Sequence, residues 1–126
     1  MTTTSRRPVY LNLLKIKLPI AGFMSIIHRA KGMFMFLALP YLIYLLDVSL
    51  SGPAGFAEAH EALHGFFGMV FVFLIMWSLV HHLLAGIRYL LIDVDMGVEK
   101  EMAAKTALWV VIAGPILGLL LTGGVL

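Results

Sequence analysis

Three long apolar runs, separated by short polar segments, dominate this chain. The first covers residues 32–46 and follows an apolar lead-in that begins at Ile20. Pro19 precedes this lead-in, and proline suits the start of a helix. The second run covers residues 65–87, and the third covers residues 107–126 without a charged side chain. At a rise of about 1.5 Å per residue, helices over these regions are long enough to cross a bilayer core of about 30 Å.

The pattern predicts an all-α integral membrane protein with three transmembrane helices and no separate soluble domain. Residues 1–126 are expected to form one domain, with a cytoplasmic segment over 1–19 and spans over about 20–50, 63–92 and 105–126. The composition agrees, because 61% hydrophobic and 13% charged residues are typical of a surface that faces lipid. The chain has no cysteine, which excludes a disulfide, a cysteine-ligated zinc site and a protein-bound iron–sulfur cluster.

Positive charges are concentrated before the first strongly apolar run, which predicts a cytoplasmic N-terminus. Residues 47–64 carry acidic side chains but no lysine or arginine and are expected outside, whereas residues 88–106 return to the cytoplasm and the C-terminus is external. A patch for anionic lipid or nucleic acid is the weaker interpretation, and no nucleic-acid partner is expected. No cleavable signal or organelle leader is recognisable, which favours a multi-pass protein of a bacterial inner (cytoplasmic) membrane. The charges concerned are Arg6, Arg7, Lys15, Lys17, Arg29 and Lys31.

A first polar stripe contains Ser25, His28, Arg29 and Gly32, whose spacing places them on one face of a helix near the cytoplasmic boundary. In the simplest interpretation, Arg29 extends to lipid phosphate and His28 lies at the membrane interface. In the functional interpretation, the stripe offers hydrogen-bond donors to a carbonyl or carboxylate at membrane depth. The spacing alone leaves both open.

A second polar stripe lies in the second span, where ionisable groups are costly unless they are paired or ligated. A neutral imidazole in this stripe, His82, has the lone pair that haem iron needs, and the small Ala85 and Gly86 leave a flat face for the macrocycle. A haem held there can direct its propionates toward the first stripe. A hydrogen bond from His82 to a carbonyl or serine is the alternative. The stripe contains Ser78, His82, Ala85, Gly86 and Tyr89.

Two other histidines compete with His82. His81 is rotated by about 100° from the small-residue face and is expected to be a bystander. His64 lies five helical turns before His82, which places it on the same face and raises the possibility of a second haem. Its position at the external boundary favours a solvated histidine instead.

The chain resembles the cytochrome b556 membrane-anchor subunits of succinate dehydrogenase, also called succinate:quinone oxidoreductase or respiratory complex II. Each motif alone is only weakly specific, but the motifs occurring together in this order are quite specific for the family. The motifs are Arg7-Pro8-Val9-Tyr10-Leu11, Ser25-Ile26-Ile27-His28-Arg29 followed by Gly32, and His82-Leu83-Leu84-Ala85-Gly86-Ile87-Arg88 with Asp93 beyond.

The resemblance implies that His82 is an axial ligand of haem b and that the second axial histidine belongs to a companion anchor subunit. It also implies that Ser25 and Arg29 line the ubiquinone site and that His28 and Arg29 approach the haem propionates. FAD and three iron–sulfur clusters would belong to the flavoprotein and iron–sulfur subunits. The chain itself would carry out no succinate chemistry and supply no catalytic residue.

The chain departs from the family pattern at Lys31, where a small hydroxyl residue is common, and at Tyr89, where many relatives have histidine. Two other functions remain open. The first is a haem-free anchor of a fumarate-reductase-like complex, which the pairing of His82 with Gly86 disfavours. The second is a small unrelated transporter or scaffold, which is disfavoured because Asp47 lies at the end of a span and not at its centre.

Overall fold

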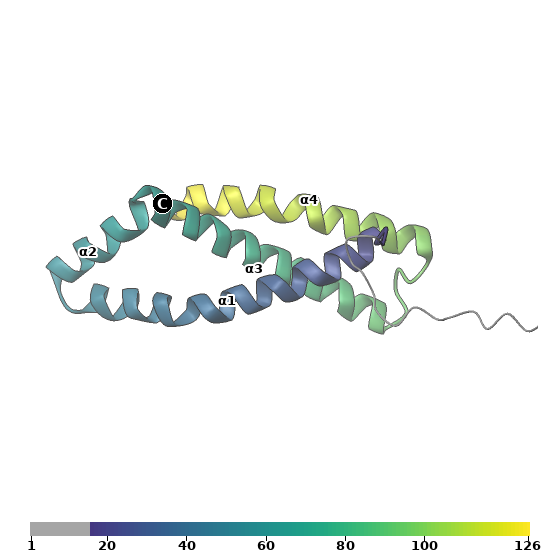
Figure 1. The fold of residues 1–126 in the computed structure, drawn as a ribbon, viewed down its shortest axis with the longest axis horizontal. Coiled ribbons are helices and arrows are strands. Elements are labelled where there is room, and N and C mark those ends of the chain that lie inside the picture. Colours follow the sequence, from purple (N-terminus) through teal and green to yellow (C-terminus); the bar gives the residue numbers. More distant parts are fainter. Residues whose placement is uncertain (1–15) are drawn as a thin grey trace, which may run out of the picture.

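The computed structural model describes residues 16–126, which form a bundle of long helices (Figure 1). The Arg7-Pro8-Val9-Tyr10-Leu11 motif and most of the expected cytoplasmic segment lie outside the described residues. Within them, α1, α3 and α4 are each long and apolar enough to cross a membrane. The prediction of three spanning helices is therefore confirmed, although the last helix begins earlier than expected. The helices are α1 (Ile20–Leu50), α2 (Pro53–His64), α3 (Phe66–Asp93) and α4 (Lys100–Val125).

The short helix α2 is not anticipated by the apolar pattern. Gly52 has φ +133°, a conformation that favours glycine and turns the chain sharply after α1. Pro53 then occupies the first turn of α2, where the missing N–H costs nothing. The helix ends at His64 because Gly65 is extended, with φ −64° and ψ 159°. His64 and His82 are therefore on different helices, and the expectation that they share one helical face is wrong.

Small residues let α4 pack closely against α3. A Cβ atom added at Gly118 would lie 2.6 Å from Cα of Trp77, so only glycine allows the two backbones to approach at this point. One turn earlier, a Cβ at Gly114 would lie 3.2 Å from Cβ of His81. Close approach through small residues is the usual way that helices associate in lipid, where burial of apolar surface gives little advantage.

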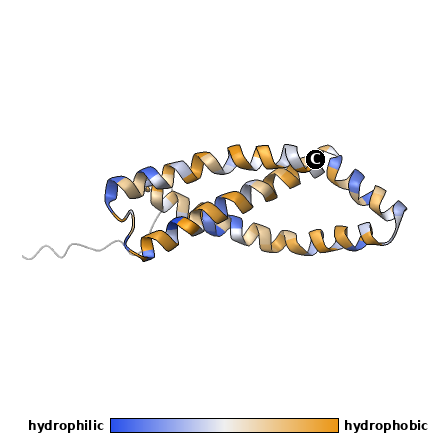
Figure 2. Cartoon of the chain, turned by 180° about the vertical axis from the view of Figure 1, so that it is seen from behind, coloured by the Kyte–Doolittle hydropathy of each residue, from blue (hydrophilic) through white to orange (hydrophobic). Residues whose placement is uncertain are grey.

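The first helix crosses α3 and then diverges from it, and α2 bridges the two at the far end (Figure 1). Near its start, α1 contributes Met24 to a buried apolar cluster with Ala85, Ala107 and Val110, which joins all three long helices. α1 begins at the same end as the turn between α3 and α4, whereas the C-terminus lies at the opposite end beside α2. Hydrophobic residues predominate along the long helices (Figure 2). Many of their side chains are exposed on the outer surface, which suits a lipid environment.

Candidate functional site

The two polar stripes meet where α1 crosses α3. The rings of His28 and His82 stack with their centroids 4.0 Å apart and their planes 13° apart. Nδ1 of His82 also donates a hydrogen bond to the backbone carbonyl of His28 at 3.3 Å. A carbonyl oxygen only accepts, so Nδ1 carries the proton, and in the neutral ring Nε2 keeps its lone pair. This is the tautomer that an imidazole needs to bind a metal through Nε2.

Two glycines shape the space around His82. A Cβ atom added at Gly32 of α1 would lie 3.0 Å from Cε1 of His82, so the absence of a side chain there makes room for the ring. A Cβ added at Gly86 would meet nothing within 4 Å, so the surface of α3 one turn from His82 is open. The spacing of these residues therefore gives His82 a fixed position beside an unfilled face.

The prediction that Ser78 and Ala85 lie on an open face beside His82 is wrong. Ser78 is 3% exposed and Ala85 is 0% exposed, and both belong to the buried side of α3 together with His81 and Arg88. These positions pack inside the bundle, so they cannot lie against a macrocycle on the outside. Only Gly86 is left as the small residue on the open side, because the direction of α4 decides which side of α3 is buried.

The first stripe is only partly assembled. His28 and Gly32 face His82, whereas Arg29 is exposed and Ser25 is half-buried. Nε of Arg29 donates to the backbone carbonyl of Ser25 at 3.4 Å, which keeps the guanidinium beside the serine. Arg29 and Ser25 are therefore neighbours on α1, next to the histidine pair.

Two polar atoms in this region are buried and have no hydrogen-bond partner among residues 16–126. They are Nε2 of His28 and the hydroxyl of Tyr89. The Tyr89 ring lies edge-on to the His28 ring, with centroids 5.4 Å apart. Buried polar groups are nearly always satisfied in native proteins, so these two atoms mark a place where a further polar group is expected.

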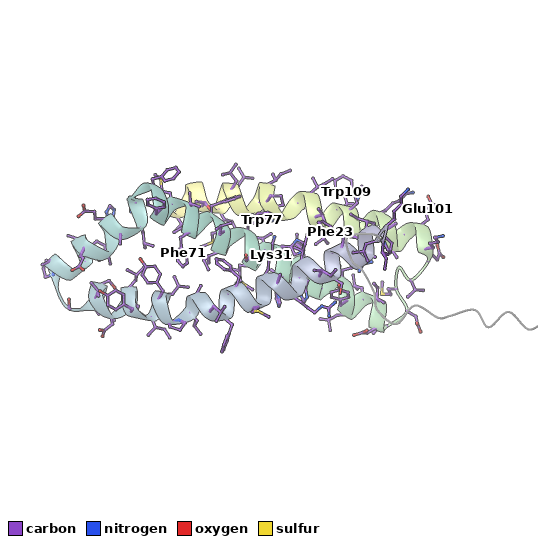
Figure 3. The ribbon with its side chains drawn as sticks, viewed as in Figure 1. Phe23, Lys31, Phe71, Trp77, Glu101 and Trp109 are labelled. Atoms are coloured by element: carbon purple, nitrogen blue, oxygen red, sulfur yellow. The ribbon has the colours of Figure 1, made fainter. Side chains whose placement is uncertain are left out.

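Lys31, where the chain differs from the family pattern, makes a specific contact with α3. Its Nζ atom lies 3.6 Å from the centre of the Trp77 ring, a cation–π arrangement between α1 and α3 that Figure 3 displays. Nζ is buried and has no hydrogen bond within the described part of the chain. The lysine is thus held against α3, under an aromatic ring.

His81 lies apart from His82, as the helical offset predicts. It is 1% exposed and packs against α4 at Gly114, where its Nδ1 would be 3.3 Å from an added Cβ. His81 is therefore enclosed between helices, whereas His82 faces α1 and the open side of α3.

Arg88 has a structural role that the sequence alone does not reveal. The sequence pattern marks it only as the cytoplasmic edge of a span, but it is 7% exposed and bonds across to α4. Its Nε donates to Oγ1 of Thr106 at 3.0 Å, and its Nη2 donates to the carbonyl of Ala103 at 2.9 Å. The sequence does contain one indication of this role. An arginine in an apolar helix is energetically costly, so hydrogen-bond partners are expected close to it.

The donor set fits one side of a haem pocket. His82 offers the lone pair of Nε2, Gly86 leaves an open surface, and Nε2 of His28 is an unsatisfied polar atom nearby. No group of three metal-ligating side chains occurs within residues 16–126. His82 is thus the histidine at this position whose ring is held by a hydrogen bond through its other nitrogen, as metal-binding histidines usually are.

Comparison with known proteins gives a consistent family. Residues 3–122 match the family described as succinate dehydrogenase/fumarate reductase transmembrane subunit. The chain is 32% identical over 116 residues to the succinate dehydrogenase cytochrome b556 subunit of Paracoccus denitrificans, across 92% of this chain and 88% of that protein. It is 34% identical over 90 residues to the cytochrome b556 subunit of Coxiella burnetii, across 71% and 72% of the two chains. It is also 32% identical over 101 residues to the cytochrome b560 subunit of Reclinomonas americana, across 75% and 69%.

Proposed function

This chain belongs to the family of succinate dehydrogenase/fumarate reductase transmembrane subunits and is the membrane-anchor cytochrome b subunit of such a complex, and from this premise we propose how its residues serve the complex. Nε2 of His82 would hold the iron of haem b, and a companion anchor subunit would supply a second ligand. Ser25 and Arg29 contact the quinone, and His28 and Arg29 approach the haem propionates.

The observation that carries the haem assignment is the hydrogen bond from Nδ1 of His82 to the carbonyl of His28. It fixes the ring orientation and leaves Nε2 as the ligand atom, which is the outer-sphere support that metal-binding histidines normally have. Gly32 admits the ring, and Gly86 leaves the adjacent face clear. When bound, haem b supplies a one-electron carrier beside the quinone site.

The quinone assignment rests on Arg29 and Ser25 being neighbours on α1. Their donors are a guanidinium and a hydroxyl. These suit the carbonyl oxygens of a quinone and the negatively charged oxygens that form as it is reduced. Negative charge that develops on those oxygens is stabilised by fixed donors, and the surrounding low dielectric strengthens the effect. Arg29 is exposed in this chain, so the remaining walls of the site come from other subunits.

The wider setting follows from charge and family membership. The flavoprotein subunit with FAD, the iron–sulfur subunit with its clusters and the second hydrophobic anchor are the proposed partners. The lysines and arginines near α1 support a cytoplasmic N-terminus in a bacterial inner membrane, with an external C-terminus. Ubiquinone is the proposed electron acceptor, and succinate is oxidised on the flavoprotein subunit.

A difference spectrum of the purified complex tests the central assignment. The dithionite-reduced minus oxidised spectrum is expected to contain the α band of a b-type haem. A complex with all its subunits present but no such band would instead identify a haem-free anchor.

A further inference from the structure

A second pair of histidines lies at the opposite end of the bundle from the turn between α3 and α4. The segment His60-Glu61-Ala62-Leu63-His64 occupies the last turns of α2. Two histidines four residues apart lie on one face of a helix, and this His-Glu-x-x-His spacing is one that helices use to bind zinc. Neither histidine belongs to the haem or quinone site described above.

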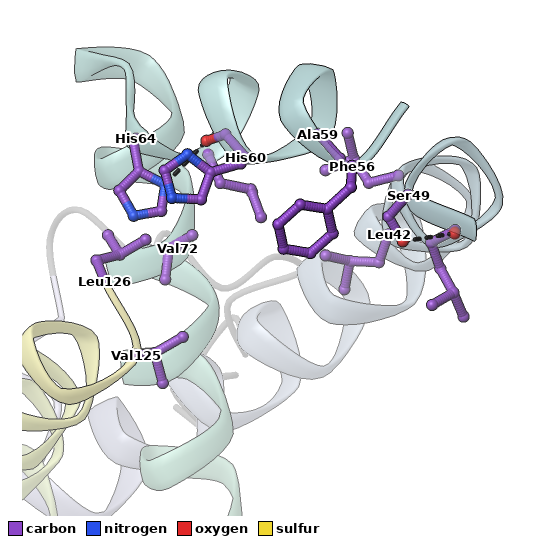
Figure 4. A pocket seen from close by; sticks show the side chains of 12 residues that line it. Leu42, Ser49, Phe56, Ala59, His60, His64, Val72, Val125 and Leu126 are labelled. Atoms are coloured by element: carbon purple, nitrogen blue, oxygen red, sulfur yellow. Dashed lines mark hydrogen bonds between the residues drawn. The ribbon is translucent and has the colours of Figure 1, made fainter. Parts of the chain in front are cut away.

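The two imidazoles are already side by side. Their ring centroids are 3.7 Å apart and their planes are 13° apart. Figure 4 shows the two rings beside each other at the cavity. Tetrahedral zinc with Zn–N bonds of about 2.0–2.1 Å places its two nitrogen ligands about 3.4 Å apart. The two rings are close enough to reach one ion, but they are stacked nearly parallel, so coordination requires the rings to tilt until the lone pairs in their planes converge.

The protonation of His64 is also that of a ligand. Its Nδ1 donates to the backbone carbonyl of His60 at 2.8 Å, so in the neutral ring the proton is on Nδ1 and the lone pair is on Nε2. His82 is held in the same way, by a hydrogen bond from Nδ1 to a backbone carbonyl. Both rings are stacked on a second histidine, which makes the two pairs similar in geometry.

The surroundings favour a cation with open coordination positions. Residues 47–64 contain three carboxylates and no lysine or arginine, so the local field attracts positive charge. His60 is exposed and His64 is half-buried, and both line a largely apolar cavity of about 330 Å³, so further ligands reach an ion from the exposed side of His60. No third imidazole or carboxylate joins them among the described residues, so water must complete the coordination.

We propose that His60 and His64 form a two-imidazole binding site for one borderline divalent transition-metal ion, such as Zn²⁺ or Cu²⁺. Imidazole nitrogen is a preferred ligand of these ions, and Mg²⁺ or Ca²⁺ would not select it. An ion held there bridges the last turn of α2, immediately before Gly65, where the chain passes into α3. With only two protein ligands the site binds metal but does not have the third ligand of a zinc hydrolase.

Zinc binding to the purified complex tests the proposal. After treatment with a chelator, the complex is dialysed against Zn²⁺ and its bound zinc is counted, for the unmodified protein and for His60→Ala, His64→Ala and Glu58→Gln. Each histidine variant is expected to bind one zinc ion fewer per complex. Glu58→Gln, an exposed change on the same helix that removes no imidazole, is expected to keep the full number. Sites on other subunits are common to all samples and cancel in the comparison.

Unchanged zinc in both histidine variants would overturn the site, as would loss in only one of them or an equal loss in Glu58→Gln. Electron paramagnetic resonance with Cu²⁺ gives a second measurement, because coupling to two imidazole nitrogens is expected and coupling to one would contradict the proposal. The haem difference spectrum, recorded on the same samples, is expected to be unchanged. It shows that the variants are assembled, and it separates failure of this site from failure of the haem assignment.

Discussion

His28 both stacks against His82 and accepts its Nδ1 hydrogen bond, so one residue of α1 fixes the position and the tautomer of a histidine on α3. The bond is made by the backbone of His28, which survives substitution of its side chain. The orientation of His82 therefore depends on where α1 crosses α3, and it connects helix packing directly to the proposed iron ligand.

Replacement of His82 by alanine is expected to remove haem b or weaken its binding, because Nε2 of His82 is the only proposed iron ligand on this chain. His81→Ala is the matched control, since His81 lies between α3 and α4 and makes no contribution to the open face. Haem content per purified complex, measured by difference spectroscopy, checks this. An equal loss of haem in the two variants would contradict the assignment and would indicate a general packing defect.

Ser25→Ala and Arg29→Leu are each expected to lower succinate:quinone activity severalfold, because both remove donors to the quinone oxygens. Loss of one preorganised donor to developing negative charge typically costs about 10²–10³-fold in rate at enclosed sites, and less where the donor is exposed as Arg29 is. Succinate oxidation by an artificial dye is expected to be unchanged, because the dye takes electrons before the quinone. A parallel fall in dye activity would make these residues determinants of assembly instead.

The spanning helices were predictable because each depends on a long apolar run, which is a property of the local sequence. The separation of His82 from His81 was predictable for a similar reason, since adjacent helical residues always point in directions about 100° apart. The short α2 was not predictable from hydropathy, because it depends on the backbone angles of Gly52 and Gly65 at its two ends.

The predictions from the sequence that are wrong mainly concern contacts between helices. The small size of Ala85 and its closeness to His82 predict a place on the haem face, but in the bundle it packs with Met24 of α1 and with Ala107 and Val110 of α4. The partners of Arg88 were missed for the same reason, because Thr106 and Ala103 approach it only after α4 has packed on α3. Which side of a helix faces a neighbour is decided by the whole bundle, and residue spacing along one helix does not contain that information.

Arg88→Met is expected to destabilise the packing of α3 on α4, because it removes two hydrogen bonds while keeping an apolar stem of similar length. Hydrogen bonds made by charged groups contribute about 1.5–3 kcal/mol each, so the change in the free energy of unfolding is expected to be of that order or larger. Thermal denaturation of the purified complex, followed by loss of haem absorbance, measures the effect.

Lys105→Met serves as the control for Arg88. Lys105 forms an ion pair with Glu101 at 2.7 Å, but the two side chains are 65% and 81% exposed. Exposed pairs of this kind contribute about 0–1 kcal/mol, so its removal is expected to leave the denaturation temperature nearly unchanged. Equal shifts in the two variants would mean that the bonds from Arg88 to α4 give no particular stability.

Gly86→Ala is expected to lower haem content or shift the haem spectrum, although the chain itself has ample room for the new methyl group. Nothing lies within 4 Å of a Cβ at Gly86 or at Gly123 of α4, and both glycines are helical. Alanine favours a helix over glycine by about 1 kcal/mol, so neither substitution destabilises the chain through its backbone.

Gly123→Ala is therefore a matched control that should leave haem content unchanged. The two variants are expected to differ because the haem macrocycle is proposed to lie against α3 at Gly86. A methyl group at Gly86 would push the macrocycle away from the helix. Unchanged haem content and an unchanged spectrum in Gly86→Ala would mean that the macrocycle does not lie against this face of α3.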